Sequence, residues 1–556
     1  MNYDQAERQN LREDASLWEG TSPWGIVVTA HYKATEAGVE ILSEGGNAID
    51  AAVASSLALG VVEPAASGLG GMAMMIVYLA DRKRTFILEG PCRAPLSATP
   101  EKLLSLAEEF KGQHPEKTSQ YNDEKIAGLV RKSGYQAVAV PTNPAVLGYA
   151  LKVYGTCSPA RVIEPALRLA EEGYVITPLQ SKLLKEYSSQ ICQGNAAAFL
   201  FGGEDNPPAP GTILRQPVMA NTLRRLAEAG FEDFYTGKIG QGIVADMAKN
   251  NGFITAADLQ KIPWPREREP LISTFGHWTI ATMPPPGGGV VLIEMLNLFE
   301  KLVPPDFDPD SPEAALLFAA IIQRARGDRR KYNLGEFTRS GKKAPDLTGK
   351  AYARKTAAKL RFELEESGET SHLNVIDRFG NVVALTQSIE RAYGAKVAAP
   401  DLGFLYNGFL KGFKLRNRRH PHFLRVGAIA RSNACPTIVF QAGRPRYAIG
   451  STSSERMVSG IFQVIVRLLN QSPFEAVKAP RLHCTPESRV FLEAGRFKPQ
   501  TLELLKKHKF ELIPYHDWAF SVGGLHLAGQ ELGKCWGVAD PRRDGSAEGC
   551  RLQPSA

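Results

Sequence analysis

Apolar positions near the start of the chain change between strand-like and helix-like spacing. Residues 25–30 form a short apolar run, which predicts a buried strand. Residues 33–44 then have helical spacing and end at the helix-stopping pair Gly45-Gly46. Asn47 can cap a second helix over 48–60, and because this helix is apolar on nearly all sides, we expect it to be buried.

Helical spacing dominates the earlier part of the chain, and strand spacing dominates the later part. Residues 96–135 are charged and loosely patterned, which favours peripheral helices, whereas residues 144–249 have clear helical periodicity. An exposed linker is expected over 342–350. After residue 370 the pattern predicts four strands and one helix: 373–377, 381–388, 436–440, 446–450 and the helix 456–469. Helix-rich flanks around a strand-rich centre fit a helix–sheet–sheet–helix sandwich.

One predicted hairpin carries the candidate chemistry. The triplet Thr370-Ser371-His372 stands at the head of the alternating strand 373–377. Residues 377–381 have the pattern of a turn, and residues 382–388 form the second strand. Thr and Ser are common in strands, so the triplet taken alone is usually structural.

A threonine at the start of a strand becomes a catalyst when the peptide bond before it is cut. The freed α-amine of Thr370 is then a base on the same residue as the hydroxyl, so no separate histidine is needed. Residues 365–369 form an exposed stretch just ahead of Thr370, which is typical of a cleavage site.

Motifs on both sides of this hairpin follow the order of one protein family. They are the segments 44–54, 60–64, 67–71, 140–142, 154–156, 234–237, 283–289, 436–439 and 450–451. In this order and at these distances they resemble the γ-glutamyltransferase family of N-terminal-nucleophile hydrolases. The resemblance covers roughly residues 25–495 and implies the family's four-layer αββα sandwich, in the α/β (α+β) class.

The resemblance implies roles for the residues around the hairpin. Precursor cleavage would fall between Glu369 and Thr370, whose hydroxyl and amine would be nucleophile and general base. Ser388 matches a family threonine that hydrogen-bonds the nucleophile. Ser453 and Ser454 replace a Gly-Gly pair whose backbone N–H groups stabilise the oxyanion. If those positions need a positive φ, serine is unfavourable there.

The expected substrate pocket departs from the family pattern. The arginine that holds the α-carboxylate is replaced by proline, and Arg93, two positions away, either reaches the pocket or lies on the surface. The aspartate that accepts the α-amine becomes Gly412, and an asparagine becomes Glu390, which would repel a carboxylate. A Ser-Ser pair becomes Ser432-Asn433. These changes remove much of the basis for recognising a zwitterionic γ-glutamyl group.

A basic run replaces part of the family's substrate-covering lid. It contains Lys411, Lys414, Arg416, Arg418, Arg419, His420 and His422. Such a run either attracts an anionic substrate or forms a solvated basic loop.

Composition argues against several other classes of protein. The chain has 66 basic and 58 acidic side chains, a mild imbalance for 556 residues, and we expect no nucleic-acid partner. The 7 cysteines include no CxxC pair, which argues against a disulfide scaffold and a zinc site. Gly68-Leu69-Gly70-Gly71 lacks the P-loop lysine and precedes a strand, so it does not predict a nucleotide site. We therefore expect neither a metal nor a cofactor.

The chain also lacks the patterns that direct proteins to membranes. The first residues are polar and contain no continuous apolar segment of a signal peptide. No run of about 18 or more apolar residues offers a membrane span. A cytoplasmic protein without a membrane partner is expected.

The main prediction is a self-processing threonine amidohydrolase or acyltransferase. Its acyl group would differ from plain γ-glutamyl, and its acceptor would be water or an amine. Residues 1–24 would be a tail, with a large-subunit segment over 25–369 and a small-subunit segment over 370–556 that associate in one domain. Two alternatives are an ordinary glutathione hydrolase/γ-glutamyltransferase and an unprocessed, non-catalytic homologue with a binding role.

Overall fold

The computed structural model describes residues 16, 18–332, 346–356 and 369–551. Most of the expected tail, the first part of the linker at 342–345 and the stretch 365–368 ahead of Thr370 lie outside the described residues. Residues 19–22, at the end of the expected tail, form a strand that pairs with Cys535–Val538 near the other end of the chain.

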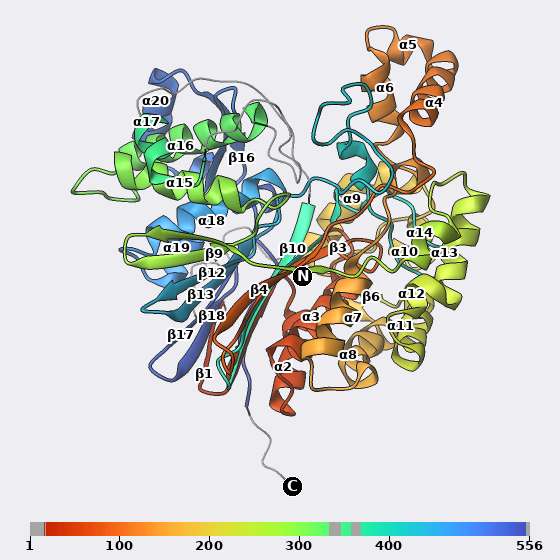
Figure 1. The fold of residues 1–556 in the computed structure, drawn as a ribbon, viewed down its shortest axis with the longest axis horizontal. Coiled ribbons are helices and arrows are strands. Elements are labelled where there is room, and N and C mark those ends of the chain that lie inside the picture. The colour runs from red at the N-terminus through yellow and green to blue at the C-terminus, as the bar shows by residue number, and fades with distance from the viewer. Residues whose placement is uncertain (1–15, 17, 333–345, 357–368, 552–556) are drawn as a thin grey trace.

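Within the described residues, two seven-stranded antiparallel sheets form the centre of the molecule (Figure 1). The strand order of the first sheet is β1 (Glu19–Ser22), β18 (Lys534–Val538), β17 (Leu525–Glu531), β13 (Arg444–Ser451), β12 (Thr437–Gln441), β9 (Trp278–Thr282) and β8 (Leu271–Phe275). The order of the second is β19 (Ser546–Gly549), β2 (Gly25–Thr29), β10 (Glu369–Asp377), β11 (Val382–Glu390), β3 (Met72–Leu79), β4 (Arg84–Gly90) and β7 (Arg266–Arg268). The predicted hairpin therefore lies in the middle of the second sheet.

Helices cover the outer face of each sheet (Figure 1). The second sheet packs against α2 (Tyr32–Ser43), α3 (Ala48–Val62), α7 (Asn143–Tyr154), α8 (Pro159–Glu172) and α11 (Pro217–Ala229). The first packs against α15 (Gly289–Leu302), α16 (Pro312–Lys331) and α18 (Glu455–Arg467). The four layers confirm the predicted αββα sandwich.

Alternation along the strands divides the core into three apolar layers. In β10, Leu373 and Val375 pack on the side of α2 and α3, whereas Ile376 packs between the two sheets. A period of two places successive side chains on opposite faces, so a strand buried on both faces can be apolar throughout. The inter-sheet layer is completed by small and branched side chains such as Ala384 and Ile438.

Local signals placed the first helices correctly. The side chain of Asn47 accepts hydrogen bonds from the N–H groups of Ile49 and Asp50, and Asp50 completes a capping box. The following helix, α3, is buried along its whole length, as its apolar pattern predicted.

The charged region 96–135 contains α4 (Pro100–Gln113), α5 (Pro115–Thr118) and α6 (Asp123–Val130), which form a lobe at the upper right of Figure 1. Besides short 3-10 helices, the remaining elements within the described residues are α9 (Pro178–Cys192), α10 (Ala197–Leu200), α12 (Asp233–Thr236), α13 (Lys238–Lys249), α14 (Ala256–Gln260), α17 (Lys350–Thr356), α19 (Pro473–Lys478), α20 (Pro499–Lys507), β5 (Tyr174–Val175), β6 (Ile213–Leu214), β14 (Leu482–Cys484), β15 (Arg489–Glu493) and β16 (Glu511–Tyr515). Among the helices of these residues, none has the length and apolar character to cross a bilayer. The cytoplasmic location stays a prediction.

Each sheet takes strands from both sides of residue 370. The first contains β1, β8 and β9 from before residue 370, and the second contains β2, β3, β4 and β7 from before it. Neither segment holds all strands of either seven-stranded sheet, so the sandwich needs both segments. The division of the chain at Thr370 stays a prediction.

Candidate active site

Thr370 and Ser388 meet across the central strands of the second sheet. Thr370 lies at the start of β10, next to an irregularity in the pairing with β11 between Glu369 and Ser371. The Thr370 hydroxyl donates a hydrogen bond to the Ser388 hydroxyl, with 3.3 Å between the oxygens. The Ser388 oxygen also accepts from the N–H of Glu390 at 2.9 Å. The two hydroxyl groups that the family resemblance paired are therefore in contact.

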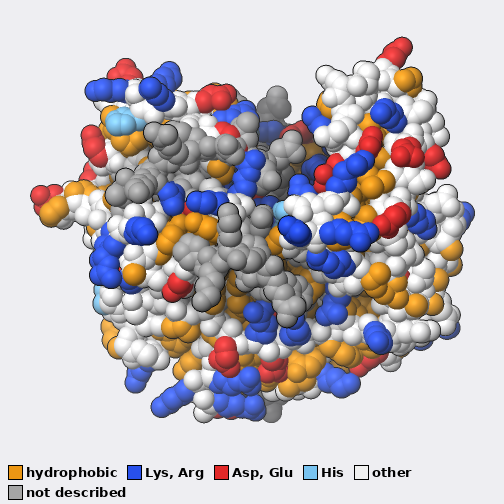
Figure 2. Space-filling model, turned by 45° about the horizontal axis from the view of Figure 1, so that its top comes forward, with side chains coloured by type: hydrophobic (Ala, Val, Ile, Leu, Met, Phe, Trp, Pro, Cys, Tyr) orange, Lys and Arg blue, Asp and Glu red, His pale blue; other side chains and the backbone are white. Residues whose placement is uncertain are grey.

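A cavity of about 740 Å³ opens in front of these hydroxyl groups. Its wall includes six residues that the sequence singled out for the site: Thr370, Ser388, Glu390, Ser432, Asn433 and Ser454. On the face seen in Figure 2, the molecule is hollowed between the lobe of α16 and α20 and the lobe of α4 and α6, and Lys and Arg side chains gather beside the hollow.

The expected oxyanion loop has the backbone conformation that glycine favours. Ser453 has a φ of 69° and Ser454 a φ of 45°, so both are left-handed. This conformation disfavours residues with a Cβ atom. Ser454 is the N-cap residue of α18, where backbone N–H groups and the helix dipole favour negative charge. Ser453 is fully buried and does not line the cavity itself.

Arg93 is not brought to this cavity. Its backbone pairs with Val140 on one side and Ile429 on the other, and its side chain is not part of the cavity wall. The sequence left open whether Arg93 reaches the pocket or lies on the surface, and the structure does not place it in the cavity wall. Gly412, which replaces the family's aspartate, does line the cavity, and it brings no side chain that could accept an amine.

Other arginines, which the sequence reasoning missed, line the cavity instead. They are Arg329, Arg330, Arg391 and Arg431. Arg431 directly precedes Ser432-Asn433, so its position in the sequence could have predicted that it lies near the site. Arg329 comes from the end of α16, far away in sequence, and no local pattern marks it.

A buried cluster of arginines stands behind Ser432. Arg329 Nη2 donates to the carbonyl oxygen of Ser432 at 2.7 Å. Burial, followed by the nearby guanidinium groups of Arg431 and Arg326, holds the pKa of Arg329 well below its usual value. Arg326, Arg329 and Arg431 thus place three guanidinium groups near this part of the wall.

One carboxylate balances part of that charge. Glu455 forms ion pairs with Arg326 and, at 3.0 Å, with Arg431. Burial opposes the ionisation of Glu455, but these two guanidinium groups outweigh it and hold the pKa of Glu455 below its usual value. Glu455 is thus an anion of the wall, and it fixes the orientation of Arg431.

Glu390 lies beside a second pair of cations. Its carboxylate is 3.3 Å from Nε of Arg391, and Lys411 lines the same cavity. Burial raises the pKa of Glu390, against the opposing effect of Arg391 and Lys411. The positive φ of Glu390, 83°, turns the chain sharply at the end of β11.

The basic run divides between the cavity and the surface. Lys411, Lys414, His420 and His422 line the cavity. Arg416 instead pairs with Asp123 of α6, with 2.5 Å between the charged atoms. Burial and the neighbouring cations lower the pKa of His422 to about 3, so this imidazole is neutral at pH 7. One part of the run therefore lines the cavity and another part lies on the surface; attraction of an anionic substrate stays a prediction.

Among the residues that the structure describes, no three His, Cys, Asp or Glu side chains are grouped so that they could hold a metal ion. The donors available at the cavity are hydroxyl, amide, guanidinium and ammonium groups, which suit an organic anion.

The αββα sandwich is the fold of the N-terminal-nucleophile hydrolases, and the chain is an enzyme of that class. The sequence profile of the family described as Gamma-glutamyltranspeptidase matches residues 34–550, so the chain belongs to that family. This confirms the resemblance drawn from the motifs.

Relatives of two kinds match most of the chain. The glutathione hydrolase proenzyme of Pseudomonas sp. (strain A14) is 30% identical over 94% of this chain and 93% of its own length. The acylase ACY 1 proenzyme of Pseudomonas sp. (strain V22) is 34% identical over 83% of each chain. The crystal structure of cephalosporin acylase from Bacillus halodurans superposes with a TM-score of 0.81 at 25% identity, covering 97% of both chains. These comparisons support an enzyme rather than a non-catalytic homologue.

Proposed function

We propose that the protein is a self-processing amidohydrolase or acyltransferase with Thr370 as its nucleophile. The observation that carries the proposal is the Thr370 hydroxyl, which lies in the cavity wall and contacts Ser388 Oγ at 3.3 Å. A hydroxyl group in this position faces the cavity in which a substrate would bind, and the Ser388 hydroxyl orients it.

The first reaction is the cleavage of the chain itself. Thr370 Oγ1 attacks the carbonyl carbon of Glu369, an ester forms, and the C–N bond to Thr370 breaks as its nitrogen takes the hydroxyl proton. Water then hydrolyses this ester and leaves the Glu369 carboxylate and a free Thr370 amine. The two fragments stay together because each sheet takes strands from both.

Turnover uses the same hydroxyl and the new amine. The amine takes the hydroxyl proton as Oγ1 attacks a substrate amide, and it returns the proton to the departing amine. Backbone N–H groups of Ser453 and Ser454, at the start of α18, stabilise the oxyanion. Water or a second amine then releases the acyl group from Thr370.

The acyl group that this cavity suits best carries a carboxylate and needs no α-amine. The arginine cluster of Arg329 and Arg431 beside Ser432 offers a site for the carboxylate. Gly412 provides no carboxylate for an ammonium group. The relatives named as acylases agree with an acyl group other than γ-glutamyl.

A γ-glutamyl group is the second candidate. Glu390 lies in the cavity wall and is placed to accept a substrate ammonium group. Relatives named glutathione hydrolase also favour this candidate.

Two measurements test the proposal. Denaturing electrophoresis with N-terminal sequencing should find two fragments, one of which begins at Thr370. Thr370→Ala should stay a single chain without turnover, whereas the control Thr274→Ala, at an exposed position of β8, should be cleaved normally. An uncleaved wild type, or turnover by Thr370→Ala, would contradict the assignment.

The acyl group is tested with a matched pair of p-nitroanilides. Glutaryl and γ-glutamyl anilides have the same chain length and differ only by the α-amine. We expect a higher kcat/KM for the glutaryl compound, with a glutaryl adduct on the fragment that begins at Thr370. A higher kcat/KM for the γ-glutamyl compound would favour the second candidate.

A further inference from the structure

The loop between β13 and α18 carries two successive left-handed serines where glycine would be free of strain. Ser453 and Ser454 have φ values of 69° and 45°. A Cβ atom makes this conformation unfavourable, so it persists only where surrounding contacts hold it. The contacts of the buried Ser453 hydroxyl therefore indicate what holds the loop in this conformation.

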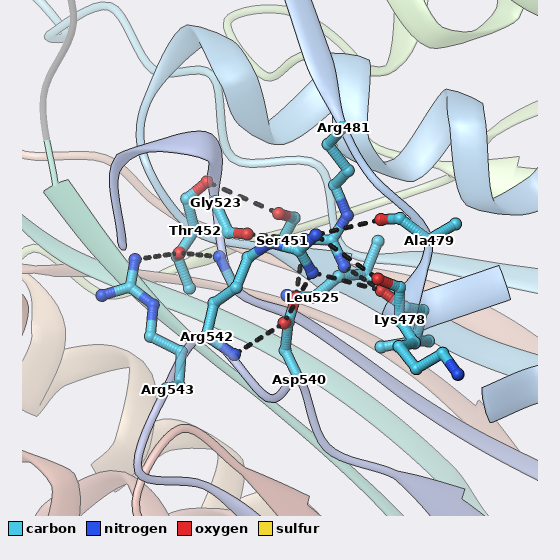
Figure 3. Close-up of polar contacts among 12 residues, drawn as sticks. Ser451, Thr452, Lys478, Ala479, Arg481, Gly523, Leu525, Asp540, Arg542 and Arg543 are labelled. Carbon is cyan, nitrogen blue, oxygen red and sulfur yellow. Dashed lines mark hydrogen bonds and ion pairs between the residues drawn. The ribbon is translucent and has the colours of Figure 1, made fainter. Parts of the chain in front are cut away.

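Arg543 provides such a contact. Its Nη2 donates to Ser453 Oγ at 3.1 Å and also to the hydroxyl of Thr452, the preceding residue. Figure 3 shows the Arg543 side chain directed at Thr452. The Thr452 oxygen accepts a further hydrogen bond from the N–H of Gly524 at 2.7 Å. One guanidinium thus fixes two consecutive side chains of the loop.

The Arg543 side chain is itself held rigidly. It is 2% exposed, and its guanidinium carbon lies 3.3 Å from the centre of the Phe520 ring. The adjacent Arg542 forms ion pairs with Asp540, as Figure 3 shows, and with Glu493, and all three side chains are buried. Asp540 in turn accepts from the N–H of Leu525 at the start of β17. The segment 540–543 is therefore anchored independently of the loop that it contacts.

Arg543 also faces the strand of the predicted nucleophile. Its Nη1 lies 4.0 Å from a carboxylate oxygen of Glu63. The same carboxylate accepts a hydrogen bond from Ser371, the residue after Thr370. A continuous chain of polar contacts therefore runs from β10 through Glu63 and Arg543 to the loop of Ser453.

We propose that Arg543 is a positioning residue that holds Ser453 in its left-handed conformation, so that the loop's backbone N–H groups stay aimed at the oxyanion. The inference rests on the proposed acyl transfer at this site. This role accounts for a serine at a position where the family has glycine. The Ser453 hydroxyl accepts a hydrogen bond from Arg543, and glycine has no side chain that could do so. With glycine at position 453, the left-handed conformation costs little and the need for Arg543 falls.

The test is a double-mutant cycle between positions 543 and 453. Arg543→Lys keeps the charge but loses the planar fork that reaches two hydroxyl groups and Glu63. In the Ser453 background we expect kcat to fall about 10- to 100-fold with KM nearly unchanged, because a misaligned oxyanion donor acts on the transition state. In the Ser453→Gly background the same change should lower kcat by no more than about threefold.

Two further measurements keep the result decisive. Arg446→Lys, on β13 and paired with Glu531, is the matched control and should leave kcat unchanged. Thermal unfolding of every variant separates loss of fold from loss of rate. Equal losses of kcat in both backgrounds would overturn the role of Arg543 but would not contradict the assignment of Thr370 as the nucleophile. A wild type that neither cleaves itself nor turns over either anilide would overturn the proposed function, and the role of Arg543 with it.

Discussion

Thr370 Oγ1 lies 3.3 Å from Ser388 Oγ, across neighbouring antiparallel strands at the centre of a seven-stranded sheet. Both side chains are at least 96% buried, and both line the cavity. Because the sheet fixes both backbones, the hydroxyl pair is pre-oriented before any substrate arrives.

Removal of the Ser388 hydroxyl should slow acyl transfer. For Ser388→Ala we expect kcat to fall about 10- to 100-fold, because the Thr370 hydroxyl loses the partner that orients it. Ser388→Thr should restore most of the rate, since it keeps the hydroxyl. Steady-state kinetics with the better anilide measures the effect, and the exposed Ser189→Ala serves as control. Full activity in Ser388→Ala would refute the role.

Arg431 should select for an acyl carboxylate. Arg431→Gln removes a cation next to Ser432, and we expect KM for the glutaryl anilide to rise about 10-fold or more, because a charged hydrogen bond is lost. KM for a butyryl anilide, which has no carboxylate, should change little. The surface variant Arg224→Gln, whose arginine pairs with Glu171, is the control. Equal effects on both substrates would argue against a carboxylate site at Arg431.

Glu390 should make binding of an anionic acyl group dependent on pH. Burial raises the pKa of Glu390 above its usual 4.5, so the side chain loses its negative charge as pH falls through that raised pKa. KM for the glutaryl anilide should therefore decrease as pH is lowered through this range, while the substrate carboxylate is still ionised. Glu390→Gln should lower KM at neutral pH and remove the dependence. An unchanged pH profile of KM in Glu390→Gln would contradict this.

The buried ion pairs of Arg542 should matter for stability. Asp540 and Glu493 are 0% exposed, and Arg542→Ala would remove the main partner of Glu493 and one of the two arginines that pair with Asp540. We expect a loss of about 3–5 kcal/mol in the free energy of unfolding. Urea unfolding measures it, against Arg489→Ala at a half-exposed pair with Glu511. A loss equal to that of the control would show that the network contributes little.

The same network predicts acid sensitivity. Burial opposes the ionisation of Asp540, yet Arg481 and Arg542 outweigh it and hold the pKa of Asp540 well below its usual value. A carboxylate with a lowered folded-state pKa contributes stability above its unfolded pKa and loses it as pH falls toward the folded one. The free energy of unfolding should therefore decline below about pH 4, and less steeply in Asp540→Asn. Equal slopes for wild type and variant would count against it.

The sequence by itself determined the features that depend on neighbours along the chain. The period-two spacing after Thr370 predicted the hairpin β10–β11, and the cap at Asn47 predicted the start of α3. The order of the motifs predicted the family and its sandwich. Such patterns suffice because strand alternation, turns and helix caps are formed between residues a few positions apart.

Only the tertiary structure decided which charges meet in the cavity. Arg329 reaches Ser432 of the cavity wall from the end of α16, and Arg543 reaches Ser453 behind that wall, whereas Arg93 does not line the cavity. These contacts join residues about a hundred positions apart. They depend on how helices and sheets pack against one another, and no local periodicity encodes that packing. The Thr370–Ser388 pair could therefore be predicted from the sequence, but the charged side chains that line the cavity could not.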